Sequence, residues 1–212
     1  MKLYDYPQAP NPRRVNIFLA EKGIDVEKVT IDLMKQEQLA DSYRQKNPAC
    51  DVPMLELDDG TCISQIRGIV HYFEAAYPDT PPLLGKTPAQ KGLVEMWEHL
   101  AFMNGLLAVA EVFRNTAKGF SDRAVVGPHN YPQSSELAER GAMRLPNFFK
   151  DFDQQLGQNE YVAGTDYSMA DITTLVTCDF AKWIKAEIPE DCKNLRAWYS
   201  KVSARPAVQA NS

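Results

Sequence analysis

The sequence lacks the features that mark proteins that bind nucleic acid, are secreted or cross a membrane. Its 23 basic residues are outnumbered by 28 acidic ones, and the formal net charge of −5 leaves no positive surplus for binding nucleic acid. No apolar run is long enough to cross a bilayer, and no apolar leader follows Lys2. We therefore expect a soluble, cytoplasmic protein that binds neither nucleic acid nor membrane.

Cysteine and histidine are also scarce. The 4 cysteines and 3 histidines are too widely spaced for a paired metal motif or a disulfide scaffold. They are Cys50, Cys62, Cys178, Cys192, His71, His99 and His129. We predict reduced thiols and no bound metal. The sequence also contains no internal repeat and no low-complexity segment.

The first 79 residues combine strand and helix patterns. Short apolar or alternating stretches predict strands at 2–5, 26–33, 54–57 and 61–63, and helical spacing predicts helices at 12–22, 36–46 and 65–77. The first two strands should be parallel because a helix connects them, and the last two should be antiparallel. The predicted order is βαβαββα.

Cap and turn residues set the predicted boundaries. Asn11 is the expected N-cap of the first helix, with Pro12 in the first helical position and Gly23 as the stop. Ser64 is the expected cap of the third helix. The run 58–60, Asp-Asp-Gly, predicts a hairpin with a type I′ turn.

From about residue 88 onward the pattern is helical throughout. The proline-rich stretch 80–87 is the predicted linker. A long helix is expected at 135–156, where Pro146 should kink it or split it in two. Residues 168–171, Ser-Met-Ala-Asp, fit a capping box with aspartate in place of glutamate. We predict an α/β domain followed by an all-α domain.

The helix that begins near residue 88 has more apolar positions than one stripe needs. They are Leu93, Trp97, Leu100, Phe102, Leu106, Val109 and Phe113. We expect this helix to be covered on two sides, by its own domain and by either the first domain or a second subunit.

A series of short motifs, in register, resembles the soluble glutathione transferase family, of bacterial type, over essentially the whole chain. The motifs are Tyr4-Asp5-Tyr6, Pro10-Asn11-Pro12-Arg13-Arg14-Val15, Leu19-Ala20-Glu21-Lys22-Gly23, Asn47-Pro48 with Val52-Pro53, Asp59-Gly60 leading into 65–69, Ala163-Gly164 and Ser168-Met169-Ala170-Asp171. The resemblance implies a thioredoxin-like glutathione-binding domain at 1–79, a linker at 80–87, an all-helical domain at 88–212 with the electrophile pocket, and a homodimer.

The resemblance further implies an enzyme that uses reduced glutathione as co-substrate, without a metal. It would activate the thiolate for attack on a small apolar electrophile, as in detoxification. Thiol–disulfide or peroxide chemistry is a related activity that the pattern leaves open. The alternative is a non-catalytic binding or regulatory protein of the same fold, because Ala9, Asp51 and Ile66 depart from the family pattern.

The residue that stabilises the thiolate differs from the family pattern. Matching without gaps from Val15 places Ala9, which cannot donate a hydrogen bond, where relatives with a hydroxyl carry serine. Asn11 is the predicted catalytic residue, because its amide can donate to a thiolate beside the positive end of a helix. The alternatives are that Asn11 only caps the helix and that Tyr6 or Tyr4 is the donor.

The resemblance places the glutathione-binding residues at two turns. Val52 precedes a cis Pro53 and should pair its backbone with the cysteinyl part of glutathione. Gln65, Ile66 and Arg67 begin the next helix and should face the γ-glutamyl end, where the helix offers free N–H groups.

The residue before Val52 departs most sharply from the pattern. Many relatives carry a lysine or glutamine that reaches the glycyl carboxylate, whereas this chain has Asp51. Because two carboxylates repel, Asp51 should point away or the ligand should differ at that end. Lys35 and Gln36 are candidates for compensating donors. Cys50 is expected to be a small buried filler, with a mixed disulfide as the alternative.

The electrophile pocket is predicted between the two domains. Its expected lining is Ala9, Phe102, Met103, Leu106 and Phe113, with Tyr131 as a further candidate. The alternative for the aromatic and methionine side chains is a place in the core, because helical spacing is typical of both.

Overall fold

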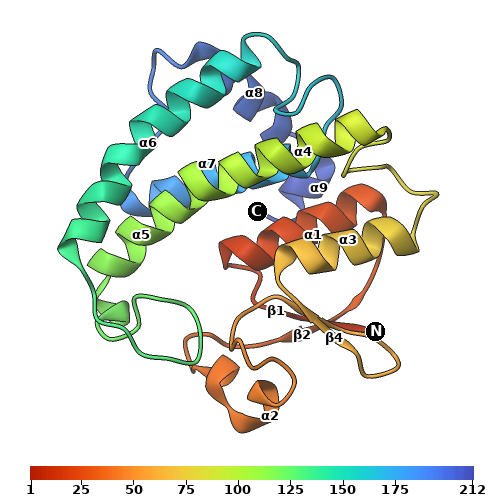
Figure 1. Cartoon of the computed structure of the whole chain (residues 1–212), viewed down its shortest axis with the longest axis vertical. Helices are drawn as coiled ribbons and strands as arrows, with labels where there is room; N and C mark the ends of the chain where they lie inside the picture. The colour runs from red at the N-terminus through yellow and green to blue at the C-terminus, as the bar shows by residue number, and fades with distance from the viewer. The chain divides into compact units, whose positions relative to one another are not determined.

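The computed structural model describes all residues 1–212, which divide into two compact units (Figure 1). The first unit holds residues 1–81 together with 125–130 and Asn211, and the helical unit holds 82–124, 131–210 and Ser212. None of the helices is both long and apolar enough to cross a membrane.

The first unit is built on a four-stranded sheet in the order β2-β1-β3-β4. Its elements are β1 Lys2–Asp5, α1 Pro10–Lys22, β2 Glu27–Thr30, η1 Glu37–Leu39, α2 Asp41–Arg44, β3 Met54–Glu56, β4 Cys62–Ser64 and α3 Ile66–Ala76. β1 and β2 are parallel, whereas β1 pairs with β3 and β3 with β4 in antiparallel fashion. The predicted βαβαββα order is confirmed.

The sheet has a different core on each of its faces. α1 and α3 lie side by side on one face (Figure 1), and Leu3 of β1 is fully buried there with apolar residues of both helices. Side chains alternate along a strand, so Tyr4 lies on the opposite face. That face carries a cluster of Ile31, Tyr43, Val52 and Met54, against which Tyr4 and Tyr6 pack. Through this cluster the sheet supports Val52, the residue before Pro53.

The start of α1 differs from the prediction. The helix begins at Pro10, so Ala9 is the N-cap and Asn11 lies inside the first turn. A proline fits the first position of a helix because its φ is already helical and its missing N–H is not needed there. Gly23 ends the helix in the left-handed conformation, as predicted. The helix expected at 36–46 is present only as the short elements η1 and α2.

The hairpin and the start of α3 also differ in detail. Only Gly60 has a positive φ in the turn, and it donates to the carbonyl of Leu57, whose own N–H donates to Thr61. A type I′ turn needs a positive φ at two residues, so that prediction was wrong. Ser64 belongs to β4, and the N-cap of α3 is Gln65, with a φ of 69°. This left-handed backbone turns the side chain of Gln65 out of the line of the strand.

The helical unit contains the remaining elements. They are α4 Pro88–Leu100, η2 Ala101–Leu106, α5 Leu107–Thr116, η3 Lys118–Phe120, α6 Ser135–Leu156, α7 Met169–Ala181, η4 Lys182–Ile184, α8 Lys193–Ser203 and α9 Pro206–Gln209. η2 is π-helical, and the N–H of Leu107 bonds to the carbonyl of Phe102, so α4, η2 and α5 form one continuous rod. α6 runs uninterrupted through Pro146, so the predicted split is wrong. α9 is a short final helix whose N-cap is Arg205.

α7 is the central helix of this unit. All of its residues except Asp179 are buried. The predicted capping box is present, with the N–H of Ser168 donating to the Asp171 carboxylate at 3.0 Å, and the Ser168 hydroxyl also donates to this carboxylate, at 3.1 Å. A buried helix that begins at a satisfied cap gives the unit a rigid centre.

Candidate functional site

The turn before β3 presents an unpaired stretch of backbone. The Val52–Pro53 peptide bond is cis, as the resemblance implied. The N–H and C=O of Val52 make no hydrogen bond in the structure, although the side chain is buried. The preceding carbonyl, that of Asp51, accepts from the Tyr43 hydroxyl at 2.6 Å and the Asn47 amide at 2.9 Å. The turn is therefore held firmly while the backbone of Val52 stays available to an extended ligand.

The side chain of Asp51 does not point away from this turn. One carboxylate oxygen accepts from the Asn47 amide at 2.8 Å, and the other accepts from the Gln65 amide at 2.6 Å. The hydrogen bond to Gln65 joins the loop before β3 to the start of α3. The carboxylate is thus directed toward the start of α3, where the resemblance places the γ-glutamyl end of glutathione.

The first turn of α3 supplies free N–H groups beside Gln65. Ile66 is the first residue of the helix and is buried, and the first intrahelical bond runs from Ile69 to the carbonyl of Gln65. The N–H of Ile66 therefore has no partner in the helix. Arg67 follows with an exposed side chain. A helix start of this kind attracts a carboxylate through its N–H groups and its dipole.

The first turn of α1 places Asn11 in a defined orientation. Its side-chain oxygen accepts from Arg14 at 3.2 Å, so its NH₂ group faces the other way and has no partner in the structure. The residues on either side, Pro10 and Pro12, have no N–H. Asn11 is therefore the residue of this turn that offers both a side-chain and a backbone donor. Ala9 precedes it as N-cap, and its own N–H is used by Tyr6.

The two tyrosines considered as alternative donors lie on the cluster face of the sheet. The Tyr4 hydroxyl donates to Glu56 at 2.6 Å, and this hydrogen bond raises the pKa of Tyr4. Tyr6 packs against the same apolar cluster. Burial raises the pKa of Tyr43 to about 12, so its hydroxyl is protonated and acts as a donor to the turn. The structure commits Tyr4 to Glu56 rather than to a ligand.

Two further predicted residues lie on the loop before η1. Gln36 is exposed with a φ of 59°, and the Lys35 ammonium pairs with Asp32 at 3.3 Å.

Cys50 lies on the loop before β3. It is buried, has a φ of 53°, and its thiol contacts the carbonyl of Pro48 at 3.6 Å. The prediction that Cys50 is a small buried filler agrees with this position.

The residues predicted for the electrophile pocket come from both units. Ala9 belongs to the first unit, and the others belong to the helical unit. Phe102 and Met103 lie in the π-helical segment, half-buried and exposed respectively, whereas Leu106 is buried. Phe113 packs edge-on against the rings of Phe120, Phe180 and Trp183, at 5.3, 5.6 and 5.5 Å. Tyr131 is exposed on a loop.

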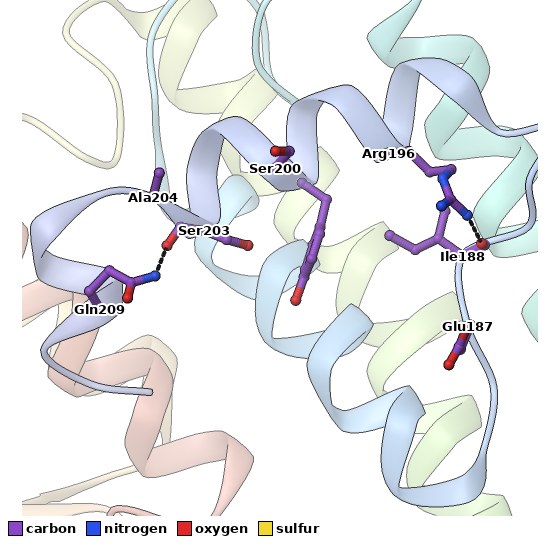
Figure 2. A pocket seen from close by; sticks show the side chains of 8 residues that line it. Glu187, Ile188, Arg196, Ser200, Ser203, Ala204 and Gln209 are labelled. Atoms are coloured by element: carbon purple, nitrogen blue, oxygen red, sulfur yellow. Dashed lines mark hydrogen bonds between the residues drawn. The ribbon is translucent and has the colours of Figure 1, made fainter.

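A cavity of about 540 Å³ lies elsewhere in the helical unit, along α8 and α9 (Figure 2). Glu187, Arg196, Tyr199 and Ser200 are among the residues that line it. The Arg196 guanidinium donates to the carbonyl of Ile188 at 3.2 Å. None of the predicted site residues lines this cavity.

Two residues of the site were not predicted from the sequence. The Tyr43 hydroxyl donates to the backbone carbonyl of Asp51. The Asn47 amide donates both to this carbonyl and to the Asp51 carboxylate. Asn47 was visible as part of an Asn-Pro pair, but that signal indicated only the end of a helix. The role of Tyr43 depends on the fold, because its hydroxyl reaches over a turn to a residue beyond Pro48.

Comparisons with known proteins agree with this arrangement. The family model for the N-terminal domain of glutathione S-transferases matches residues 3–81, and the model for their C-terminal domain matches 124–210. Glutathione S-transferase 2 of Saccharomyces cerevisiae is 38% identical over 212 residues, which cover 99% of this chain and 88% of that protein.

Solved structures extend the likeness to the fold. The crystal structure of Gtt2 from Saccharomyces cerevisiae matches with a TM-score of 0.91 and 37% identity, covering 100% of both chains. A glutathione S-transferase domain-containing protein of Marinobacter aquaeolei matches with a TM-score of 0.91 and 34% identity over 98% of this chain and 100% of that one. A class Gtt2 enzyme of Vibrio parahaemolyticus gives 0.83 and 31%, over 100% and 96%. The chain therefore belongs to the glutathione S-transferase family, in its Gtt2-like class, and has the glutathione transferase activity of that family.

Proposed function

We propose that the first unit binds reduced glutathione along the turn before β3 and the start of α3. The observation that carries this proposal is the unpaired backbone of Val52, which lies in a turn held by Tyr43 and Asn47. The cysteinyl part pairs with this backbone, as an added strand would. The γ-glutamyl end reaches Gln65 and the free N–H of Ile66, where the helix dipole favours its carboxylate.

We further propose that Asn11 stabilises the glutathione thiolate. A free cysteine thiol has a pKa of about 8.5, so little of it is ionised at neutral pH. The NH₂ group of Asn11 has no partner in the structure, and Arg14 fixes the opposite side of the amide. A fixed donor at the positive end of α1 lowers the pKa of a thiol beside it.

The reaction that fits these groups is conjugation of the thiolate to an apolar electrophile. Position 9 carries alanine rather than cysteine, so the start of α1 has no thiol of its own for disulfide exchange. We propose that the π-helical segment, with Phe102 and Met103, supplies apolar contacts for the electrophile. All four cysteines are unpaired, which fits work in the reducing cytoplasm.

Calorimetric titration with reduced glutathione tests the proposed binding. We expect a single site with a dissociation constant below the millimolar range, followed by turnover of a chloronitrobenzene in a standard conjugation assay. Val52 contributes through its backbone, so Val52→Ala should retain binding. Absence of any heat of binding at millimolar glutathione would contradict the proposed site.

We also propose that the enzyme is a homodimer. Leu93 and Met96 lie one helical turn apart on α4 and expose 43% and 46% of their surface, although both are large and apolar. Apolar side chains grouped on a helix face are typical of a surface that a partner covers. Sedimentation velocity should give twice the 23.9 kDa of one chain, and a single species of 23.9 kDa would contradict the proposal.

A further inference from the structure

The fixed position of Asp51 has a consequence for the ligand. Its backbone carbonyl is held by Tyr43 and Asn47, and its two carboxylate oxygens are held by Asn47 and Gln65. Rotating the side chain away would break the hydrogen bonds at 2.8 and 2.6 Å. The carboxylate is therefore part of the surface that a ligand at Val52 and Gln65 meets.

The charge of Asp51 is not neutralised within the chain. Both partners of the carboxylate are neutral amides, and no lysine or arginine forms an ion pair with it. Each carboxylate oxygen has a second lone pair, so each can accept one more hydrogen bond. Asp51 is partly buried, and a partly buried anion gains from a nearby cation more than an exposed one does.

The hydrogen bond from Gln65 to Asp51 also decides which atoms of the Gln65 amide remain for a ligand. A carboxylate only accepts, so the NH₂ side of the Gln65 amide must face Asp51. The amide oxygen and the second N–H of the amide are then left for a ligand. The Asp51 carboxylate and the Gln65 amide oxygen are both acceptors, and the carboxylate carries a negative charge, so a positive donor is favoured beside them.

From this geometry we propose that Asp51, with Gln65, binds the ammonium group of the γ-glutamyl residue and restricts the site to thiol peptides with a free α-amino acid head. The proposal rests on the proposed glutathione site. The α-carboxylate of the same head lies at the N–H of Ile66, so both charges of the head find an opposite partner. Asp51 acts as a specificity-determining residue and takes no part in thiolate formation.

The opposite assignment makes a different prediction. If Asp51 faced the glycyl carboxylate, the two anions would repel, and removal of the charge at Asp51 would tighten glutathione binding. If Asp51 binds the ammonium group, removal of its charge weakens glutathione binding. The sign of the change therefore separates the two.

The test compares glutathione with glutaryl-cysteinylglycine, which lacks only the ammonium group, by calorimetric titration. With the wild-type chain we expect glutathione to bind about 10- to 100-fold more tightly, the range for a charge-assisted hydrogen bond. With Asp51→Asn we expect this ratio to fall below about 3-fold, mostly through weaker glutathione binding. Asp79→Asn removes an exposed carboxylate from the same unit and should leave the ratio unchanged.

Two results would overturn the proposal. A wild-type ratio below about 3-fold would show that the ammonium group is not recognised, whether or not the Asp51→Asn variant folds. Tighter glutathione binding by Asp51→Asn would assign the residue to the glycyl end instead. If the wild-type chain bound neither peptide, the proposed glutathione site itself would fail, which is a separate result.

Discussion

Asp171→Ala should destabilise the helical unit by about 3–5 kcal/mol, which is a large fraction of the stability of an ordinary domain. The carboxylate of Asp171 is fully buried and accepts from four donors. These are the N–H of Val162 and the indole N–H of Trp198, both at 2.9 Å, and the N–H and hydroxyl of Ser168, at 3.0 and 3.1 Å. Alanine would leave these donors buried without an acceptor.

The ionisation of Asp171 is consistent with this role. Burial raises the pKa of its carboxyl to about 6, while the four donors oppose the shift, so the group is ionised at neutral pH. An ionised acceptor makes stronger hydrogen bonds than a neutral one, which adds to the loss in the alanine variant.

Urea unfolding followed by far-ultraviolet circular dichroism measures the effect at pH 7. Asp151→Ala is the matched control, because Asp151 is exposed on α6, and its midpoint should stay close to that of the wild type. An Asp171→Ala variant with an unchanged midpoint would show that the buried network contributes nothing to stability.

Asn11→Ala should raise the pKa of the bound glutathione thiol by about one to two units, equivalent to the loss of a hydrogen bond to a charged group. The sign follows from the donor. Removing an N–H that stabilises the anion favours the protonated thiol, so the pKa rises and less thiolate is present at neutral pH. We expect kcat/KM near pH 6.5 to fall about 10- to 100-fold.

The thiolate absorbance of the enzyme–glutathione complex, titrated against pH, gives this pKa directly. Gln8→Ala is the control, because Gln8 has an exposed side chain on the loop that leads into α1. An unchanged thiol pKa in Asn11→Ala, with glutathione still bound, would return the residue to a purely structural role and direct attention to another donor.

Local signals in the sequence were enough to predict much of the fold. The strands, the stop at Gly23, the hairpin and the capping box at Ser168 each depend on residues only a few positions apart. The comparisons support the enzyme rather than the non-catalytic alternative, although the sequence left both open.

The predictions that failed depend on choices that local signals leave open. Both Pro10 and Pro12 are compatible with a first helical turn, so the sequence could not decide that Ala9 rather than Asn11 is the N-cap. Pro146 costs α6 one hydrogen bond, yet the buried residues around it, such as Leu145 and Phe149, keep the helix in one piece.

The candidate site shows the same limit. Asp51 and Gln65 are 14 positions apart, and their contact exists only because the strands β3 and β4 bring the two turns together. From the sequence we could predict that Asp51 would repel a ligand carboxylate. We could not predict that the Gln65 amide fixes the Asp51 carboxylate in place.

The π-helical segment at 101–106 explains why the long rod of the helical unit had too many apolar positions for one stripe. A π turn accommodates an additional residue. The side chains after it are therefore rotated by about 100° from the directions that an uninterrupted α-helix would give them. On the two sides of this segment the rod has different main neighbours, α7 for α4 and α6 for α5. A single helix can then serve two neighbours in succession, with the rotation located at Phe102 and Met103.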